Sequence, residues 1–269
     1  MPFLKVMKRI LLLSDFLGYG KVACNAMIPI LNYNDIETLC LPTSLVSNTL
    51  NYGQFNIYNT TSFIEDSLNT YNKLNIKYQC LYSGFLFDKK QFDIIKDIKK
   101  RDSDLLYVLD PIMADDHKLY NGVDDAKVDN YKELLKLADI IIPNYTESLL
   151  LCGYRANDDV GYDVIADKLK MLAKSFVITS YVENNEHFVI VYDHILDKLD
   201  KIAYEYLPYS LAGTGDIFAS ILISNYLNGY DLYTSSIKTI RSINTLIKAN
   251  MHLKQGKPLA IEQYLDKIF

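Results

Sequence analysis

Short apolar runs alternate with amphipathic helical stretches along almost the whole chain, and this alternation limits the folds that the chain can adopt. Most of the runs are continuously apolar, as strands are when helices cover both faces of a sheet. The alternation therefore favours an α/β fold with a mostly parallel central sheet between two layers of helices. We predict strands at 9–14, 37–41, 78–82, 105–109, 140–142, 176–179, 188–192 and 202–206.

Helical patterns fill segments between these strands and dominate the C-terminal part of the sequence. Apolar residues keep helical spacing over 61–77, 90–100 and 124–138. After Asp216 we expect helices only, at 217–229, 231–253 and 260–268. No helical pattern separates the two strands between 187 and 206, so these strands are expected to pair as a hairpin. No repeat or linker interrupts the 269 residues, so we treat 1–269 as one domain.

The composition is that of a globular protein and argues against several classes of partner. The net charge is −5 and no run of Lys or Arg exceeds three residues, so neither nucleic acid nor an anionic membrane surface is expected to bind. No stretch approaches the roughly 18 apolar residues that a membrane-spanning helix needs. The cysteines show no metal-ligand spacing, and we interpret Cys24, Cys40, Cys80 and Cys152 as buried thiols in a reducing compartment, the cytoplasm. The histidines share no spacing either, so a zinc enzyme or a Ser-His-Asp hydrolase is not supported, and we expect surface positions for His117, His187, His194 and His252.

The most informative short motif is Ala212-Gly213-Thr214-Gly215-Asp216, which precedes an apolar helical stretch. Two glycines around a threonine allow a tight turn with outward N–H groups, and the following helix adds the positive end of its dipole. Together they make a site for a phosphate-like anion. Asp216 at the helix entrance could then accept a proton from an attacking hydroxyl, which indicates phosphoryl transfer to an alcohol. The alternative is an aspartate that only caps the helix.

Polar residues follow several predicted strands, at the edge of the sheet where ligands of α/β proteins bind. Asp110 and Asp115 follow the fourth strand, either facing a metal–phosphate group or forming a solvated acidic turn. Asn144 and Glu147 follow the next strand and, being three residues apart, share one face of a helix start. Their oxygens are ligands of the kind that Mg²⁺ prefers, but a capping box would use the same two residues.

Hydroxyl groups and glycines mark two further strand ends. Thr179 and Ser180 close the sixth strand and suit contact with a phosphate or a sugar. Ser14 closes the first strand, and Gly18-Tyr19-Gly20 follows as either a flexible lip over a small ligand or an ordinary loop. This Gly-x-Gly lacks the third glycine of a dinucleotide fingerprint and the Gly-Lys-Ser/Thr of a P-loop.

In their order along the chain, these motifs resemble those of the ribokinase-like fold, and within it the pyridoxal/pyridoxamine kinase branch. The resemblance covers nearly the whole chain. It rests on Ser14, Leu41-Pro42-Thr43-Ser44 with Ser47-Asn48, Tyr82-Ser83-Gly84-Phe85, Asp110-Pro111-Ile112-Met113, Pro143-Asn144-x-x-Glu147 and Ala212-Gly213-Thr214-Gly215-Asp216. It implies a ribokinase-like three-layer sandwich and ATP-dependent phosphorylation of the hydroxymethyl group of a vitamin B6 vitamer (pyridoxal, pyridoxine or pyridoxamine). It also implies Mg²⁺ and a homodimer, and leaves open a monovalent cation.

The resemblance gives a role to each matching residue. Asp216 would be the general base, and the backbone of Gly213, Thr214 and Gly215 would form the anion hole for the transferred phosphoryl group. Asn144 and Glu147 would organise magnesium and the ATP phosphates, Asp110 and Asp115 would lie near the metal–triphosphate, and Thr179 and Ser180 would contact ATP, with Asp110 and Glu147 as candidate metal ligands. Ser14 would hydrogen-bond the pyridine ring, and Tyr19, Ser47 and Phe85 would lie near the vitamer.

The chain departs from the family pattern at a few positions. Thr49, Leu50 and Asn51 stand where His-Thr-Gly or His-Thr-Gln is usual, so a polar substrate contact is missing at Leu50, and Ala114 replaces a glycine. Two alternatives therefore remain. One is a hydroxymethylpyrimidine kinase of thiamine synthesis, a branch that usually carries Gly-Thr-Gly-Cys. The other is a non-catalytic vitamer-binding protein, which Leu50 alone supports.

Overall fold

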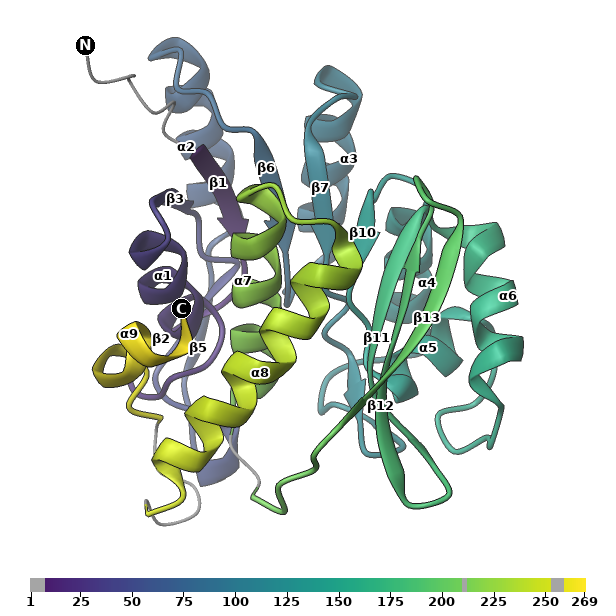
Figure 1. Ribbon diagram of the computed structural model, residues 1–269. Helices are drawn as coiled ribbons and strands as arrows, with labels where there is room; N and C mark the ends of the chain where they lie inside the picture. The colour runs from purple at the N-terminus through teal and green to yellow at the C-terminus, as the bar shows by residue number, and fades with distance from the viewer. Residues whose placement is uncertain (1–7, 210–211, 253–258) are drawn as a thin grey trace, which may run out of the picture.

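The computed structural model describes residues 8–209, 212–252 and 259–269. Its centre is an eight-stranded sheet with the order β13-β12-β11-β10-β7-β6-β1-β3 (Figure 1). Seven of the eight strands run in one direction, and β12 alone is antiparallel, to both of its neighbours β11 and β13, so the predicted hairpin is confirmed. All eight predicted strands are present: β1 Lys8–Leu13, β3 Ile36–Cys40, β6 Cys80–Ser83, β7 Leu106–Leu109, β10 Ile140–Ile141, β11 Ser175–Glu183, β12 Glu186–Asp193 and β13 Lys198–Tyr204.

Helices cover both faces of this sheet, as the resemblance to the ribokinase-like fold implies. One face carries α1 Cys24–Tyr33, α7 Thr214–Leu227, α8 Leu232–Asn250, the short η2 Glu262–Tyr264 and α9 Leu265–Ile268 (Figure 1). The other face carries α2 Thr61–Lys73, α3 Lys89–Arg101, α4 Asp125–Leu135, α5 Tyr145–Leu151 and α6 Tyr162–Leu172.

The sequence of β1 shows why the sheet has two apolar faces. Ile10 and Leu12 belong to the core beneath α1 and α7, whereas Leu11 and Leu13 belong to the core beneath α2 to α6. Successive side chains of a strand point to opposite faces, so a continuously apolar strand fits only between two helical layers. Helix α7 is itself apolar on most of its circumference because it lies buried against α1, α8 and the sheet.

Two small sheets were not predicted. β2 Phe16–Leu17, β4 Ser44–Val46 and β5 Ile57–Asn59 form the first of them, in the order β2-β4-β5, and the short 3₁₀ helix η1 Leu50–Tyr52 lies between β4 and β5 in the chain. β8 Ala114–Asp115 and β9 Lys118–Leu119 form the second. Because β2 follows β1 and β4 follows β3, the three-stranded sheet extends from the edge of the central sheet where β1 and β3 end.

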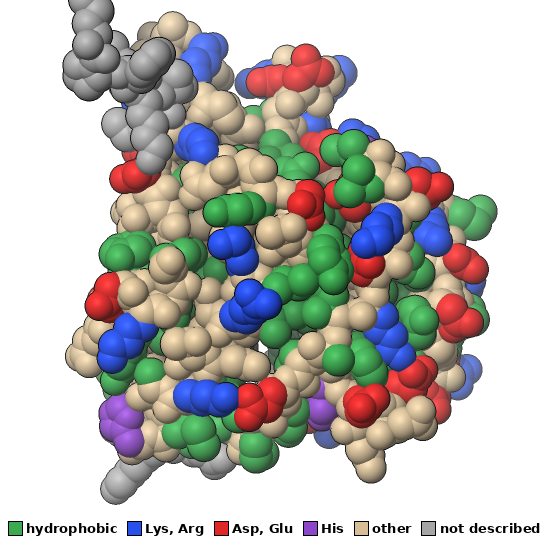
Figure 2. Space-filling view, in the orientation of Figure 1, with side chains coloured by type: hydrophobic (Ala, Val, Ile, Leu, Met, Phe, Trp, Pro, Cys, Tyr) green, Lys and Arg blue, Asp and Glu red, His purple; other side chains and the backbone are tan. Residues whose placement is uncertain are grey.

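The molecular surface and the helices agree with a globular chain of mixed charge. Figure 2 shows basic and acidic side chains interspersed over the face that carries α1 and α8. None of the helices within the described part of the chain is long and apolar enough to cross a membrane. The four cysteines are unpaired thiols, and three of them, Cys24, Cys80 and Cys152, are buried as expected, whereas Cys40 is partly exposed.

Candidate active site

The loop before α7 has the geometry that the Gly-Thr-Gly-Asp motif predicts. Gly213 adopts a left-handed conformation, with φ at 87°, and α7 begins at the next residue, Thr214. Asp216 therefore lies inside the first turn of the helix. The interpretation of Asp216 as the N-cap is wrong, because Gly213 occupies that position and no side chain caps this helix. The Asp216 carboxyl group therefore lies beside the N–H groups of the first turn without serving as the N-cap.

Burial is the main influence on the pKa of the Asp216 carboxyl group. Burial raises the pKa of its carboxyl group to about 7, and the negative charge of Asp15 acts in the same direction, while the backbone N–H of Ala23 opposes the shift. Its Oδ1 atom is buried and accepts no hydrogen bond from any described residue. Asp15, which follows β1 and Ser14, is itself shifted, since burial raises its pKa to about 6. A carboxyl group with the raised pKa of Asp216 has the property that general-base catalysis near neutral pH favours.

Asp110 lies close enough to Asp216 for the two carboxyl groups to interact electrostatically. Asp110 follows β7 and is almost completely buried. Burial and, second, the charge of Asp216 raise its pKa to about 8, and a hydrogen bond of 3.0 Å from the Tyr82 hydroxyl to Oδ2 opposes the shift. Among the described residues, no three His, Cys, Asp or Glu side chains converge as a complete metal-binding group. The carboxylates here could supply one or two ligands to a metal that also binds phosphate.

Asn144 and Glu147 form the capping box that the sequence left open as an alternative. The Asn144 side chain accepts the Glu147 N–H at 2.9 Å, and Glu147 Oε2 accepts the Asn144 N–H at 2.9 Å. Glu147 does more than cap the helix, because its Oε1 also accepts the backbone N–H of Met113 at 3.0 Å. Asn144 Nδ2 donates to the Ala114 carbonyl at 2.7 Å. The pair therefore ties the start of α5 to the segment 110–115, and its role as a metal ligand stays a prediction.

Glu147 also belongs to the group of interacting acids. It is buried, and burial followed by the charge of Asp110 holds its pKa well above the ordinary range, against the three backbone N–H groups that it accepts. The sequence-predicted acids Asp110, Glu147 and Asp216 are thus connected through their charges. Asp115 is the exposed residue of β8, next to the buried Ala114, at the outer end of the same segment.

Thr179 and Ser180 lie where β11 becomes irregular. A β-bulge falls between Ile178 and Tyr181, and Ser180 has a left-handed backbone with φ at 65°. Thr179 forms a bridge with Asn144, so the end of β11 adjoins the capping box. Bulges re-aim side chains next to ligand sites. Contact of these hydroxyl groups with ATP remains a prediction.

The residues predicted to contact the vitamer follow β1 and β6 of the central sheet or β2 and β4 of the three-stranded sheet. Ser14 is fully buried, and a Cβ atom on Gly84 would stand 2.6 Å from its hydroxyl oxygen, so only glycine fits beside it. The Ser47 hydroxyl accepts the Asn56 N–H at 2.9 Å, which ties β4 to β5. Ser14 and Ser47 thus lie on different parts of the structure, one in the core and one at the edge.

Three aromatic residues and Leu50 lie at partly or fully exposed positions after β2, β4 and β6. Tyr19 and Tyr52 approach with ring centroids 6.0 Å apart, and the Lys127 ammonium lies 4.2 Å above the ring of Phe85. Leu50 is about half exposed, with 49% of its surface accessible, so the position of the missing polar contact faces outward. We refer to Tyr19, Leu50, Tyr52 and Phe85 as the rim.

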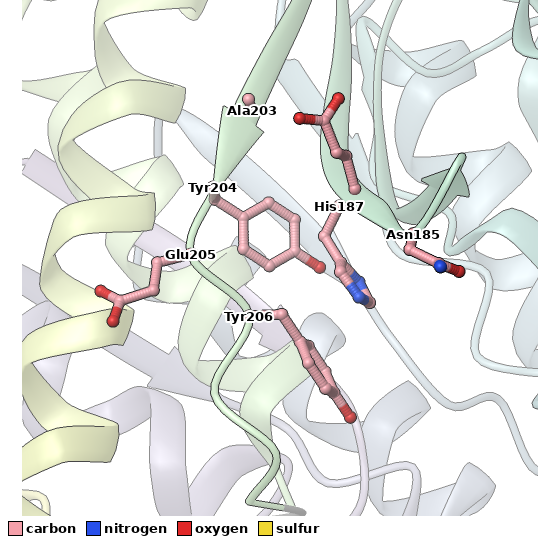
Figure 3. Close-up of a pocket in the computed structure, with 7 residues that line it drawn as sticks. Asn185, His187, Ala203, Tyr204, Glu205 and Tyr206 are labelled. Carbon is pink, nitrogen blue, oxygen red and sulfur yellow. The ribbon is translucent and has the colours of Figure 1, made fainter.

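Sequence reasoning missed a hollow of about 590 Å³ beside the ends of β12 and β13 (Figure 3). The rings of His187 and Tyr206 stack with centroids 4.1 Å apart and planes 6° from parallel, and Tyr204 packs against His187 at 5.8 Å. The side chain of Glu205 points away from His187 toward α8, where its carboxylate pairs with the Lys248 ammonium at 2.6 Å. His187 is therefore partly buried, unlike the expected surface residue. The Tyr-x-Tyr spacing at the end of the predicted strand 202–206, where alternate residues share one face, was the available signal, although β13 itself ends at Tyr204.

Comparison with known proteins shows to which family the chain belongs. The family of phosphomethylpyrimidine kinases matches residues 34–259. The chain belongs to this family. A Schizosaccharomyces pombe protein provisionally named a pyridoxal kinase is 26% identical over 247 residues, which are 87% of this chain and 78% of the other. The pyridoxal kinase of Dictyostelium discoideum is 30% identical over 179 residues, 61% of this chain and 58% of that enzyme.

Solved structures resemble the fold over its full length. A Bacteroides thetaiotaomicron protein provisionally named a phosphomethylpyrimidine kinase superposes with a TM-score of 0.92, at 26% identity, over 100% of this chain and 96% of the other. A second crystal form of it, described as containing pyridoxal, gives a TM-score of 0.90 at 26% identity over 97% and 96%. Pyridoxal kinase from Lactobacillus plantarum shares the fold, with a TM-score of 0.89 at 22% identity over 97% and 96%. The predicted ribokinase-like fold and the resemblance to the pyridoxal kinase branch are confirmed.

Proposed function

We propose that the protein transfers the γ-phosphoryl group of ATP to the hydroxymethyl group of a vitamin B6 vitamer. The observation that carries this proposal is the position of Asp216 in the first turn of α7. That helix begins directly after Gly213, which has a left-handed backbone. This arrangement puts a base that titrates near neutral pH beside N–H groups that suit a phosphoryl anion. The pyridoxal kinases among the relatives and the pyridoxal-containing structure of the Bacteroides protein support the choice of alcohol.

Each part of the site then has a definite task. Asp216 accepts the proton of the substrate hydroxyl as that oxygen attacks the γ-phosphorus. The N–H groups at the start of α7 stabilise the charge on the transferred phosphoryl group, which is where positioning and electrostatics matter most in phosphoryl transfer. Ser14 holds the ring of the vitamer from the end of β1, and the rim covers the substrate.

Magnesium fits the acids of this site. Burial raises the pKa of Asp110, Glu147 and Asp216 because the ionised carboxylates lack a compensating charge, and no described basic side chain forms a salt bridge with any of them. A divalent cation bound to the triphosphate would supply the missing positive charge. Asp110 is the residue best placed to hold it, with Glu147 fixing the loop that carries Asp110 and Asp115.

The aromatic hollow is the proposed site for the base of ATP. Tyr206 precedes the Gly213 loop in the chain by only seven positions, so the hollow and the phosphate site are connected by one segment. A stacked His–Tyr pair offers a flat face to a nucleobase, and such stacking contributes about 1–3 kcal/mol per base. Tyr206→Ala should raise KM for ATP several-fold without changing KM for the vitamer. Tyr230→Ala, at another exposed tyrosine, is the matched control, and an unchanged KM for ATP in Tyr206→Ala would remove the hollow from the site.

A hydroxymethylpyrimidine or its phosphate is the second candidate substrate. The family match and the name of the Bacteroides protein favour it, while Asp216 in place of the usual cysteine favours the vitamer. Release of ADP should be measured with pyridoxal, pyridoxine, pyridoxamine and hydroxymethylpyrimidine. A higher kcat/KM for the pyrimidine would overturn the vitamer assignment. No turnover with any of them would favour the non-catalytic alternative.

A substitution at Leu50 in the rim tests in a second way whether the substrate is a B6 vitamer. Leu50→Thr restores the hydroxyl that the family carries at this position, and one neutral hydrogen bond contributes about 0.5–1.5 kcal/mol. This variant should lower KM for a B6 vitamer several-fold and change kcat less. An unchanged or higher KM for every vitamer would mean that Leu50 does not occupy the expected position.

We also propose that the protein is a cytoplasmic homodimer. The outer face of the three-stranded sheet supports the dimer, because Phe16, Leu45 and Tyr58 form a row across β2, β4 and β5 with exposed fractions of 37%, 45% and 70%. Exposed apolar rows of this kind are candidate interfaces. The unpaired cysteines agree with a reducing compartment. Sedimentation of the wild type and of Tyr58→Lys tests the dimer, since a monomeric wild type would contradict it.

A further inference from the structure

Tyr82 is a fully buried tyrosine whose hydroxyl reaches the acids of the active site. It lies on β6, within the core beneath α1 and α7, and its hydroxyl donates to Oδ2 of Asp110 at 3.0 Å. We propose that Tyr82 is a positioning residue, which fixes the carboxylate of Asp110 so that its other oxygen meets the divalent cation of the nucleotide. The inference rests on the proposed function, because that function gives Asp110 its metal.

The backbone already ties these two residues together. β6 pairs with β7 in parallel, with Tyr82 opposite Val108 and Ser83 opposite Leu109, and the Asp110 N–H donates to the Ser83 carbonyl at 2.9 Å. The main chain therefore fixes where Asp110 leaves the strand. It does not fix the rotation of the carboxyl group, and the hydrogen bond from Tyr82 does so by holding one of the two oxygens.

The other carboxyl oxygen is left for a ligand. No described residue donates a hydrogen bond to Oδ1 of Asp110, whereas Oδ2 is occupied by Tyr82. Tyrosine also suits this position because its hydroxyl is a neutral donor. A lysine or arginine would orient the carboxylate equally well but would neutralise it, and the cation would then lose an electrostatic partner. Outer-shell hydrogen bonds of this kind orient metal ligands, and their loss costs about 10–100-fold in metal affinity.

The structure offers a matched control on the neighbouring strand. Tyr107 on β7 is also fully buried and also has a paired hydroxyl, which lies 2.7 Å from the Ser83 hydroxyl. Its side chain belongs to the opposite core, beneath α2 to α6. Tyr107→Phe therefore removes a buried hydroxyl group from the same sheet without touching Asp110.

The experiment measures binding of Mn²⁺ in the presence of ADP, from the electron paramagnetic resonance signal of the free ion. Tyr82→Phe should weaken Mn²⁺ binding about tenfold or more, and Tyr107→Phe should leave it within about twofold of the wild type. In steady state, Tyr82→Phe should raise the metal concentration needed for half-maximal rate, with KM for the vitamer unchanged. Thermal unfolding of both variants shows whether each is folded during the titration.

Asp110→Asn separates the inference from the proposed function. If Asp110→Asn weakens Mn²⁺ binding but Tyr82→Phe binds like the wild type, the metal role of Asp110 stands and the positioning role of Tyr82 is overturned. If Asp110→Asn itself binds Mn²⁺ like the wild type, Asp110 holds no metal. Both the assignment of Asp110 as a metal ligand and the positioning role of Tyr82 then fail. Equal weakening in Tyr82→Phe and Tyr107→Phe would also overturn the inference, since any buried hydroxyl would then have the same effect.

Discussion

Gly213 and Lys21 lie in direct backbone contact, so that a Cβ atom on Gly213 would overlap the carbonyl oxygen of Lys21. The contact joins the loop before α7 to the segment 18–23, which leads from β2 into α1. That segment is itself constrained, because Ala23 has a left-handed φ of 47° and its N–H faces Asp216. The loop that we propose as the phosphoryl-binding site and Asp216, the proposed base, are thus held by the same short segment.

Gly213→Ala should destabilise the protein and reduce activity. The substitution adds a clash to a left-handed backbone, and strained backbone of this kind costs about 1–3 kcal/mol for each residue. Gly215→Ala is the control, since a Cβ there meets no atom within 4 Å. Thermal unfolding should show a melting temperature several degrees lower for Gly213→Ala only. Equal melting temperatures would mean that the segment 18–23 moves aside freely.

Asp216→Asn should abolish turnover and spare nucleotide binding. The amide keeps the size of the side chain but cannot accept the proton, and loss of a general base costs about 10²–10⁴-fold in rate. Asp125→Asn is the control, because Asp125 also lies in the first turn of a helix, α4. Single-turnover rates and ADP titrations test both variants. A kcat above about a tenth of the wild-type value in Asp216→Asn would remove its role as the base.

The pH dependence of kcat/KM should show the ionisation of Asp216. The base must be unprotonated, and burial raises its pKa to about 7, so kcat/KM should rise as the pH increases from about 6 to 8. If the divalent cation of the bound nucleotide lies nearer to Asp216 than the phosphate charges do, it favours the ionised carboxylate, and the corresponding rise in kcat should then lie at lower pH. A kcat/KM that stays constant between pH 6 and 8 would show that Asp216 titrates elsewhere.

Glu147→Gln should disturb the segment 110–115 and raise the magnesium requirement. The carboxylate accepts the N–H groups of Asn144 and Met113, and a glutamine would turn its own N–H₂ toward one of them. A buried donor left unpaired costs about 1–3 kcal/mol. Magnesium titrations of the rate and thermal unfolding measure the two effects, with the exposed Glu133→Gln as control. Superimposable titrations would leave Glu147 with a capping role alone.

Asp110→Asn should stabilise the nucleotide-free protein at alkaline pH. The folded-state pKa of Asp110 is raised from 3.8 to about 8, so the folded state holds this proton more tightly than the unfolded state does. Its contribution to stability is therefore present at low pH and is lost as the pH rises toward 8. The melting temperature of the wild type should fall from pH 5 to 8.5, and the fall should be smaller in Asp110→Asn. Asp129→Asn, at a side chain that is 72% exposed, should behave like the wild type.

The sequence predicted the central sheet well because most of its strands lie in apolar runs that are buried on both faces, and even the short strand β10 is marked by such a run. The sequence prediction failed at α1, where Pro29 inside the helix removes an N–H and weakens the helical pattern. It failed also at the three-stranded sheet, because its strands are two or three residues long and partly exposed, and therefore show neither an apolar run nor a period.

The site was predicted from local motifs, and the contacts between distant residues were not. The capping box of Asn144 and Glu147 was one of the two alternatives that the sequence left open. Nothing local indicated that Glu147 would also accept a hydrogen bond from the Met113 N–H. Nor did the sequence indicate that Tyr82 would reach Asp110, since that contact needs the register of β6 and β7. Such contacts depend on the assembled sheet and carry no periodic signal along the chain.

The burial of α7 has a consequence for how the protein moves. This helix carries Asp216 and has apolar neighbours on nearly all sides, so its central amide protons should exchange with solvent only when the whole molecule unfolds. The three-stranded sheet and the rim have exposed backbone and few buried contacts, and their amides should exchange through small local openings. The rates at which a ligand enters and leaves the site then depend on how often those openings occur. Substitutions in the rim are therefore expected to change the entry and release of ligands without moving Asp216, because the core holds the helix that carries it.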